Sequence, residues 1–165
     1  MSAARALSAL LVFSGFVLFG RVRCSRKKLE ESQTEALLTD VTAIECRLGA
    51  LRQPLERLVG SAAEQSAVSC FWTEISKGLS SGKTPSEAFE VAGDRIISSG
   101  AREILRELFS EIGSSDLKSE LQRLSFAQKR LNALAEETKS RTGSELKLTN
   151  SLSVMMGLAA ALLLL

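Results

Sequence analysis

The sequence predicts an all-α protein, in which a small antiparallel bundle of about six helices is flanked by N-terminal and C-terminal transmembrane helices. Two observations predict this arrangement. Both ends of the 165-residue chain are apolar, whereas the middle is polar. In the middle, apolar residues recur every three or four positions, and no stretch shows the alternation of a strand. We expect a membrane anchor at 1–22, a helical domain at 23–147 and a second transmembrane helix at 148–165.

The C-terminal segment 148–165 is uncharged over 18 residues, which is close to the shortest helix that crosses about 30 Å of hydrocarbon. Its polar residues follow Lys147 directly, so one end of the helix can stay hydrated. A buried core helix of this composition would need a much larger protein around it. The segment therefore predicts a membrane span.

The N-terminal segment is shorter, with 15 uncharged residues between Arg5 and Arg21. It can span a bilayer if these two side chains extend to the interface or if the bilayer thins locally. A secretory signal peptide is the alternative. However, Leu18 stands where a small residue should precede Gly20, and basic residues follow at once. We therefore predict an uncleaved anchor.

Basic residues lie on the inner side of both apolar segments, which predicts that the middle of the chain faces the cytoplasm. They are Arg21, Arg23, Arg26, Lys27 and Lys28 after the first segment, and Lys139, Arg141 and Lys147 before the second. The chain has three cysteines and no Cys-x-x-Cys motif, as expected for reduced cytoplasmic thiols. We expect free thiols, two of them packed in the core, among Cys24, Cys46 and Cys70.

The first helix of the domain is predicted over 29–49, where one apolar stripe repeats at spacings of four, three and four. Gly49 is its predicted C-terminal cap. The stripe consists of Leu37, Val41, Ile44 and Leu48.

Five further helices follow by the same reasoning. Pro54 begins one with Leu55, Leu58 and Val59 on its core face, and another covers about 67–79. Thr84, Pro85 and Glu87 predict a capping box at the next helix start, with Ile96 on its later core face. A helix around 104–112 ends at Gly113. A long helix then starts near Asp116 and continues toward the second span, with its weakest point at Gly143.

No residue pattern indicates catalysis, a cofactor or a metal site. Histidine is absent, the acids are scattered among lysines and arginines, and no Cys/His spacing suits zinc. The stretch from Gly78 to Thr84 resembles a phosphate-binding loop, but it is one residue short and follows a helix. With a formal net charge of only +2, nucleic-acid binding is not expected either. We therefore predict a protein that is not an enzyme.

Small residues recur every fourth position in the second apolar segment, at Ser153, Gly157 and Ala161. This spacing lets helix backbones approach closely in lipid. The partner would be the first span or another subunit. The alternative is that glycine and alanine are simply frequent in membrane helices.

Several of these features together resemble the stage III sporulation protein AB family of endospore-forming bacteria, over nearly the whole chain. They are the N-terminal anchor, the basic turn that follows it, the element from Gly49 to Pro54-Leu55-Glu56, the element Phe109-x-x-x-Gly113-x-x-Asp116, and the long last helix entering a leucine-rich segment. The family often carries glutamine and histidine early in the last helix, where this chain has Glu120, Leu121, Gln122 and Arg123.

The resemblance implies a six-helix cytoplasmic domain, similar to those of platform proteins in type II secretion and type IV pilus machines. The helices that begin at Pro54 and Pro85 would be its repeated units. It also implies a scaffold in the channel between mother cell and forespore. The protein would lie in the membrane around the forespore, with its domain in the mother-cell cytoplasm. There it would couple a separate secretion-type ATPase to the other subunits. The protein could also form a homo-oligomer.

Two other functions stay open at this point. One is a platform component of a pilus or type II secretion apparatus, although those proteins usually carry two copies of the domain and three spans. The other is a membrane-bound helical signalling protein, which would need a ligand pocket or a partner enzyme.

Overall fold

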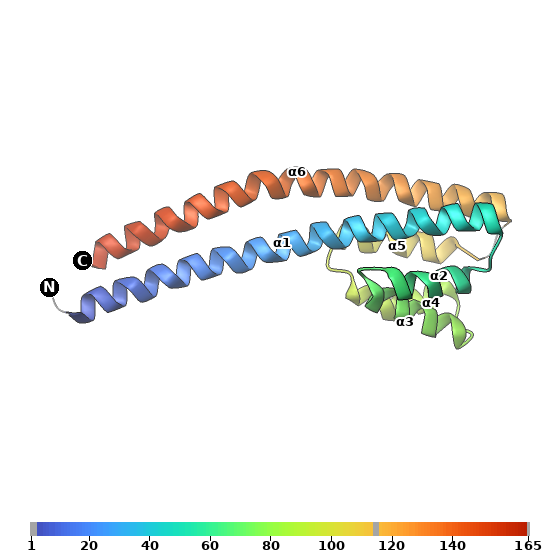
Figure 1. The fold of residues 1–165 in the computed structure, drawn as a ribbon, viewed down its shortest axis with the longest axis horizontal. Helices are drawn as coiled ribbons and strands as arrows, with labels where there is room; N and C mark the ends of the chain where they lie inside the picture. Colours follow the sequence, from blue (N-terminus) through green and yellow to red (C-terminus); the bar gives the residue numbers. More distant parts are fainter. Residues whose placement is uncertain (1–2, 114–115, 165) are drawn as a thin grey trace. The chain divides into compact units, whose positions relative to one another are not determined.

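The computed structural model describes the backbone of residues 3–113 and 116–164, and the side chains of 24–113 and 116–143 with a few beyond. These residues contain no β-strand, so the predicted all-α class is confirmed (Figure 1). The elements are α1 (Ala3–Leu51), α2 (Leu55–Gln65), α3 (Ser69–Ser80), α4 (Pro85–Ala92), the 3₁₀ turn η1 (Gly93–Arg95), α5 (Ser99–Glu111) and α6 (Leu117–Leu164).

The contacts divide the chain into two compact units. The terminal unit comprises Met1–Leu29 and Thr138–Leu165, and the central unit comprises Glu30–Glu137. The two long helices, α1 and α6, each contribute to both units. The predicted boundaries at residues 22 and 147 stay predictions.

The terminal unit is built from the first part of α1 and the last part of α6. Among the residues that the structure describes, no helix combines the length and the apolar character needed to cross a membrane. Most side chains of the predicted spans, in 6–20 and 148–165, lie outside the described residues.

In the central unit, the predicted stripe of α1 is buried. Leu37 and Val41 have no exposed surface, and Ile44 and Leu48 are also buried. The predicted cap at Gly49 is wrong, because the helix continues to Leu51. The left-handed residue that ends it is Arg52, with φ of +49°, whose N–H donates to the Leu48 carbonyl at 3.1 Å.

The next two helices, α2 and α3, pack on each other. Pro54 is the N-cap residue of α2 and has extended backbone, so the helix begins at Leu55, one position after the predicted start. Leu58 and Val59 are buried, as the predicted core face requires. A close approach of α3 to α4 explains Gly78, since a Cβ there would lie 2.7 Å from the Ala88 Cβ.

At the start of α4, the predicted capping box is confirmed. The Thr84 hydroxyl accepts from the Glu87 N–H at 3.3 Å, and the Glu87 carboxylate accepts from the Thr84 N–H at 2.9 Å. The helix is shorter than expected, because it ends at Ala92 and passes into η1. Ile96 is buried as predicted, but it lies in extended backbone after the helix.

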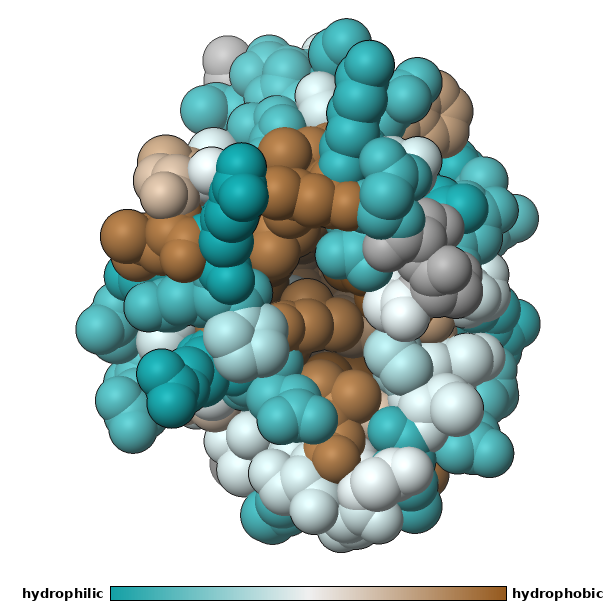
Figure 2. Space-filling model, turned by 90° about the vertical axis from the view of Figure 1, so that its right-hand side faces the viewer, coloured by the Kyte–Doolittle hydropathy of each residue, from teal (hydrophilic) through white to brown (hydrophobic). Residues whose placement is uncertain are grey.

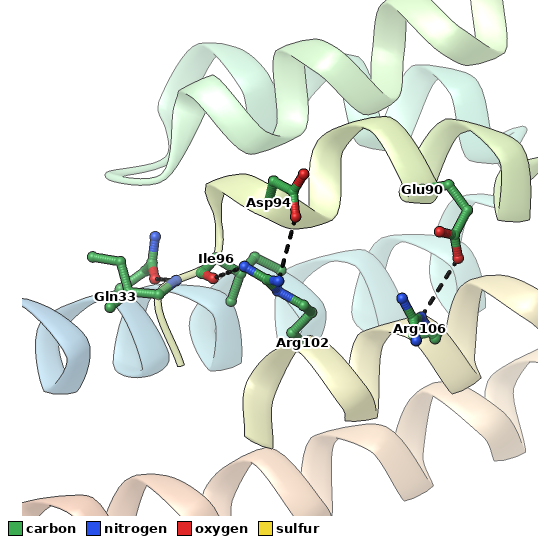
Figure 3. Close-up of polar contacts among 7 residues, drawn as sticks. Gln33, Glu90, Asp94, Ile96, Arg102 and Arg106 are labelled. Atoms are coloured by element: carbon green, nitrogen blue, oxygen red, sulfur yellow. Dashed lines mark hydrogen bonds and ion pairs between the residues drawn. The ribbon is translucent and has the colours of Figure 1, made fainter. Parts of the chain in front are cut away.

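Two side chains hold this extended segment from opposite sides (Figure 3). The Gln33 side chain of α1 donates to the Arg95 carbonyl at 2.9 Å and accepts from the Ile97 N–H at 2.7 Å. Arg102 of α5 donates to the Ile96 carbonyl at 2.8 Å and forms an ion pair with Asp94 at 3.3 Å. The segment therefore has a fixed path between α4 and α5, although it is not helical.

The core of the central unit is rich in aromatic rings. Phe71 packs edge-on against Trp72, with ring centroids 4.9 Å apart, while Phe89 stacks on Phe109 at 5.6 Å. From α6, Leu124 and Leu131 enter the same core, as the predicted stripe of the last helix requires. These contacts give the helices one shared hydrophobic core.

Candidate interaction surface

The four residues that the sequence analysis singled out in the domain lie at connections between helices. Pro54 precedes α2, Pro85 begins α4, and Gly113 and Asp116 lie between α5 and α6. All three connections are at the right-hand end of the central unit in Figure 1. Figure 2 views this end directly and shows apolar side chains lining a hollow within a polar rim.

At this end, Gly113 lies against Pro85. A Cβ on Gly113 would be 3.4 Å from the Pro85 Cγ, and the φ of Gly113 is +91°. The Gly113 N–H donates to the Glu120 carboxylate at 3.0 Å. Backbone conformation and helix contact therefore explain both Pro85 and Gly113 as fold elements.

Asp116 marks the start of α6. Its carbonyl accepts from the Glu120 N–H at 3.1 Å, and its carboxylate accepts from the Ser119 hydroxyl at 2.6 Å. The hydrogen bond from Ser119 holds the pKa of Asp116 below its ordinary value. About two turns further along α6, Arg123 pairs with Glu111 at 3.1 Å. Glu120 and Arg123 thus connect the start of α6 to the end of α5.

A groove of about 580 Å³ follows the packing of α5 against α6. Its floor includes Leu108 and Ala127, which are buried, and its rim carries Phe126, which is 58% exposed. The Arg130 guanidinium lies 5.6 Å from the centre of the Phe126 ring and also pairs with Glu107. An exposed aromatic ring beside an arginine is the composition that protein interfaces favour.

A second groove, of about 700 Å³, lies between α1 and α6 on the other side of Lys129. It is lined by Thr39, Thr42, Cys46 and Gln128, whose amide donates to the Thr42 hydroxyl at 2.9 Å. Both grooves border the same part of α6 and are open to solvent. This part of α6 is therefore bordered by open grooves on two sides.

The cysteines are free, but the expectation that two of them are buried is wrong. Cys46 and Cys70 are exposed, and Cys24 is partly exposed. For Cys46 the reason is helical geometry: it is two residues from both Ile44 and Leu48, and therefore lies on the opposite face of α1 from the buried stripe.

One polar cluster of the central unit was not predicted. The Asp40 carboxylate accepts from the Trp72 indole N–H at 2.6 Å and from the Ser66 hydroxyl at 2.5 Å. Burial raises the pKa of Asp40, although both hydrogen bonds act against that rise. These residues are up to 32 positions apart, so no local sequence motif predicts the cluster. It satisfies the polar atom of a buried indole, which is a structural role.

In the part of the chain that the structure describes, no group of three or more histidine, cysteine or acidic residues could hold a metal ion. Ser153, Gly157 and Ala161, the predicted packing positions, have helical backbone, and their side chains lie outside the described residues. The sequence analysis also missed Phe126. The sequence feature that could have identified Phe126 is its position as an aromatic residue on the polar face of the helix, away from the stripe of Leu124 and Leu131.

One of three comparisons with known proteins gave a match. Stage III sporulation protein AB is the family whose pattern matches residues 5–165. A search of curated proteins gave no match, and a search of solved structures gave none. The family match covers almost the whole chain, and this family is not known for enzymes. The chain therefore belongs to the stage III sporulation protein AB family, and this membership implies a role in sporulation.

Proposed function

We propose that the protein is a non-catalytic membrane scaffold of the channel complex between mother cell and forespore. The observation that carries this proposal is the family match over residues 5–165. It is supported by the surface of the central unit, which offers open grooves between helices. A scaffold needs such surfaces, because it works through its partners.

In this proposal the two apolar segments hold the protein in the membrane that surrounds the forespore, with the central unit in the mother-cell cytoplasm. The support comes from the uncharged stretches 6–20 and 148–165 and from the basic residues on their inner sides. The continuous helical backbone of α1 and α6 over these stretches suits membrane helices.

The partner that we propose for the central unit is a secretion-type ATPase, a separate subunit that the protein couples to the rest of the channel. We assign the contact to the groove between α5 and α6. Its exposed Phe126 can insert into a partner's pocket, and Arg130 can pair with an acidic group beside it. The ion pair with Glu107 orients Arg130 before the partner arrives.

A complementation experiment tests the assignment. Deleting the gene should block sporulation after engulfment, and the wild-type gene should restore it. Phe126→Ala should restore it poorly although the protein accumulates normally. Val91→Ala is the matched control, because Val91 is 57% exposed but lies outside the groove. Normal spore yield in the deletion strain would contradict the scaffold function, and full rescue by Phe126→Ala would contradict the groove as contact site.

The natural cysteines test the membrane arrangement. A thiol reagent that does not cross membranes should label Cys46 and Cys70 only after the mother-cell membrane is permeabilised, since both side chains are exposed. Carbonate extraction should leave the protein in the membrane fraction. Labelling of intact cells, or release of the protein by carbonate, would contradict this part of the proposal.

A further inference from the structure

The terminal and central units carry opposite charge, and this separation is not apparent from the chain's formal net charge of +2. The terminal unit has nine basic residues and one acidic residue, Glu145, which gives a formal charge of +8. The central unit has twelve basic and eighteen acidic residues, which gives −6. The two values sum to the +2 of the whole chain.

The change of sign is sharp within α1. From residue 3 to residue 29 the helix carries six basic residues and no acidic one. From residue 30 to residue 51 it carries five acidic residues and one basic residue, Arg47. The sign therefore changes between Leu29 and Glu30, which is also where the contacts separate the two units. Two independent properties, charge and packing, divide the helix at the same residue.

The same boundary recurs in α6. Glu136 and Glu137 are the last residues of the central unit, and Lys139 and Arg141 follow within four positions. Among the described side chains, Arg26, Lys28, Lys139 and Arg141 are exposed to solvent. Both long helices thus present cationic groups directly beyond the central unit.

We propose that these residues form a cationic collar that binds anionic phospholipid headgroups. The collar comprises Arg21, Arg23, Arg26, Lys27, Lys28, Lys139, Arg141 and Lys147. The inference rests on the proposed membrane attachment and adds to it the class of lipid. An anionic surface attracts each lysine or arginine near it, whereas a neutral lipid surface has no net charge to attract them.

The position of the collar along each helix suits a headgroup layer. At about 1.5 Å per residue, 21–28 and 139–147 each cover about 10–12 Å along the helix axis. The two polar layers of a bilayer together add about 10–15 Å to a hydrocarbon core of about 30 Å, so one layer is about 5–8 Å thick. The basic residues next to each uncharged stretch would lie within that layer, and the remaining ones directly outside it. Each basic segment adjoins one of the uncharged stretches, so its charges would reach the headgroups when that stretch is in the hydrocarbon.

The charge of the central unit also supports anionic phospholipid as the ligand of the collar. At −6 this unit is repelled by an anionic membrane, so only the collar would be attracted to it. Opposite charges in the two units would therefore give the protein a defined side toward the lipid.

Energy transfer to labelled lipids tests the proposal on the full-length protein. A donor dye is attached to Cys24, inside the collar, in a chain with Cys46→Ser and Cys70→Ser, because these two thiols are exposed. The protein is reconstituted into vesicles of phosphatidylcholine and phosphatidylglycerol that contain an acceptor on one lipid or the other. We expect the phosphatidylglycerol acceptor to be enriched about twofold or more around the dye.

Two triple variants that each remove three positive charges test whether the collar causes the enrichment. Arg26→Gln with Lys28→Gln and Arg141→Gln should abolish most of the enrichment. Arg57→Gln with Lys83→Gln and Arg95→Gln, at exposed positions of the central unit, should leave it unchanged. The enrichment of the wild type should also fall at about 1 M salt, where the screening length is about 3 Å.

The outcomes separate this inference from the proposed function. Equal transfer to both acceptors in protein that floats with the vesicles would overturn the collar and leave membrane attachment intact. An equal loss of enrichment in both triple variants would also overturn it. Protein that does not float with vesicles of any composition would overturn membrane attachment itself.

Discussion

Gly113 and Pro85, from connections 28 residues apart, lie against each other at the end of the central unit, with 3.4 Å between a Cβ built on Gly113 and the Pro85 Cγ. At this separation the added carbon makes ordinary van der Waals contact. The cost of a side chain at Gly113 therefore comes from its φ of +91°, which L-residues rarely adopt.

We expect Gly113→Ala to lower the free energy of unfolding by about 1–3 kcal/mol, the usual cost of a non-glycine residue in such a conformation. The measurement is urea unfolding followed by the fluorescence of Trp72, the single tryptophan of the chain. Gly60→Ala is the control. It lies within α2, where a Cβ would come no closer than 4.0 Å to Ser76, so it should stabilise the protein by about 0.5–1 kcal/mol. Equal stability of Gly113→Ala and the wild type would contradict the strained conformation.

The approach of α3 to α4 predicts a steric effect at Gly78. Its added Cβ would lie 2.7 Å from the Ala88 Cβ and 3.1 Å from the Ala88 Cα, which forces the helices apart. We expect Gly78→Ala to destabilise the protein by about 1–3 kcal/mol, as overpacking does elsewhere. The double variant Gly78→Ala with Ala88→Gly should regain part of this loss, because it removes the closest carbon. Additive losses in the same urea experiment would show that the two positions are not in contact.

The capping box predicts how stability depends on pH. Hydrogen bonds from Thr84 hold the pKa of Glu87 below its ordinary 4.5. The carboxylate therefore stabilises the fold above pH 4.5, and this contribution is lost as the pH falls through the lowered pKa. We expect Thr84→Ala to cost about 1 kcal/mol at neutral pH, because α4 loses its N-cap.

Thr84→Ala keeps the backbone N–H that donates to Glu87, but it removes the hydroxyl that also lowers the pKa of Glu87. The difference in stability between Thr84→Ala and the wild type should therefore shrink in acid by the part that comes from the contact of this hydroxyl with the charged carboxylate. Urea midpoints measured from neutral pH to below the ordinary pKa of Glu87 would show this convergence. Glu87→Gln should remove most of the pH dependence that comes from this site. A constant difference between Thr84→Ala and the wild type across this range would show that the Thr84 hydroxyl does not lower the pKa of Glu87.

Local sequence rules predicted most helices of the central unit, because burial at helical spacing is a local property. The stripe of Leu37 and Val41 and the capping box of Thr84 are examples. The same rules placed the end of α1 at Gly49, whereas the helix continues until Arg52 adopts the left-handed conformation. Where a helix ends depends on contacts with other parts of the chain, and the spacing of apolar residues carries no information about those contacts.

The candidate interaction surface was less predictable. Pro85 and Gly113 were recognisable as helix boundaries, but their contact was not, and Phe126 was not singled out. The hydrogen bonds of the Gln33 side chain to the backbone of Arg95 and Ile97 connect residues more than 60 positions apart. Such contacts depend on how the helices pack, which a single sequence does not state.

The buried indole of Trp72 predicts losses of stability of different size for two substitutions at Asp40. Trp72 is 1% exposed, and its N–H donates to the Asp40 carboxylate. Asp40→Ala leaves this donor without its partner, so we expect a loss of about 1–3 kcal/mol. Asp40→Asn keeps an acceptor oxygen and removes the cost of a partly buried charge, so it should lose much less at neutral pH.

The pH dependence of Asp40 has the opposite sign to that of Glu87. Burial raises the pKa of Asp40 above its ordinary 3.8, so the folded state binds the proton more tightly than the unfolded state does. Stability from this site therefore falls as the pH rises from 3.8 to the raised value, and is then constant. Asp40→Asn should remove this fall, so its stability relative to the wild type should increase over that interval. A relative stability that is the same at pH 3.8 and at neutral pH would show that burial does not disfavour the charged carboxylate.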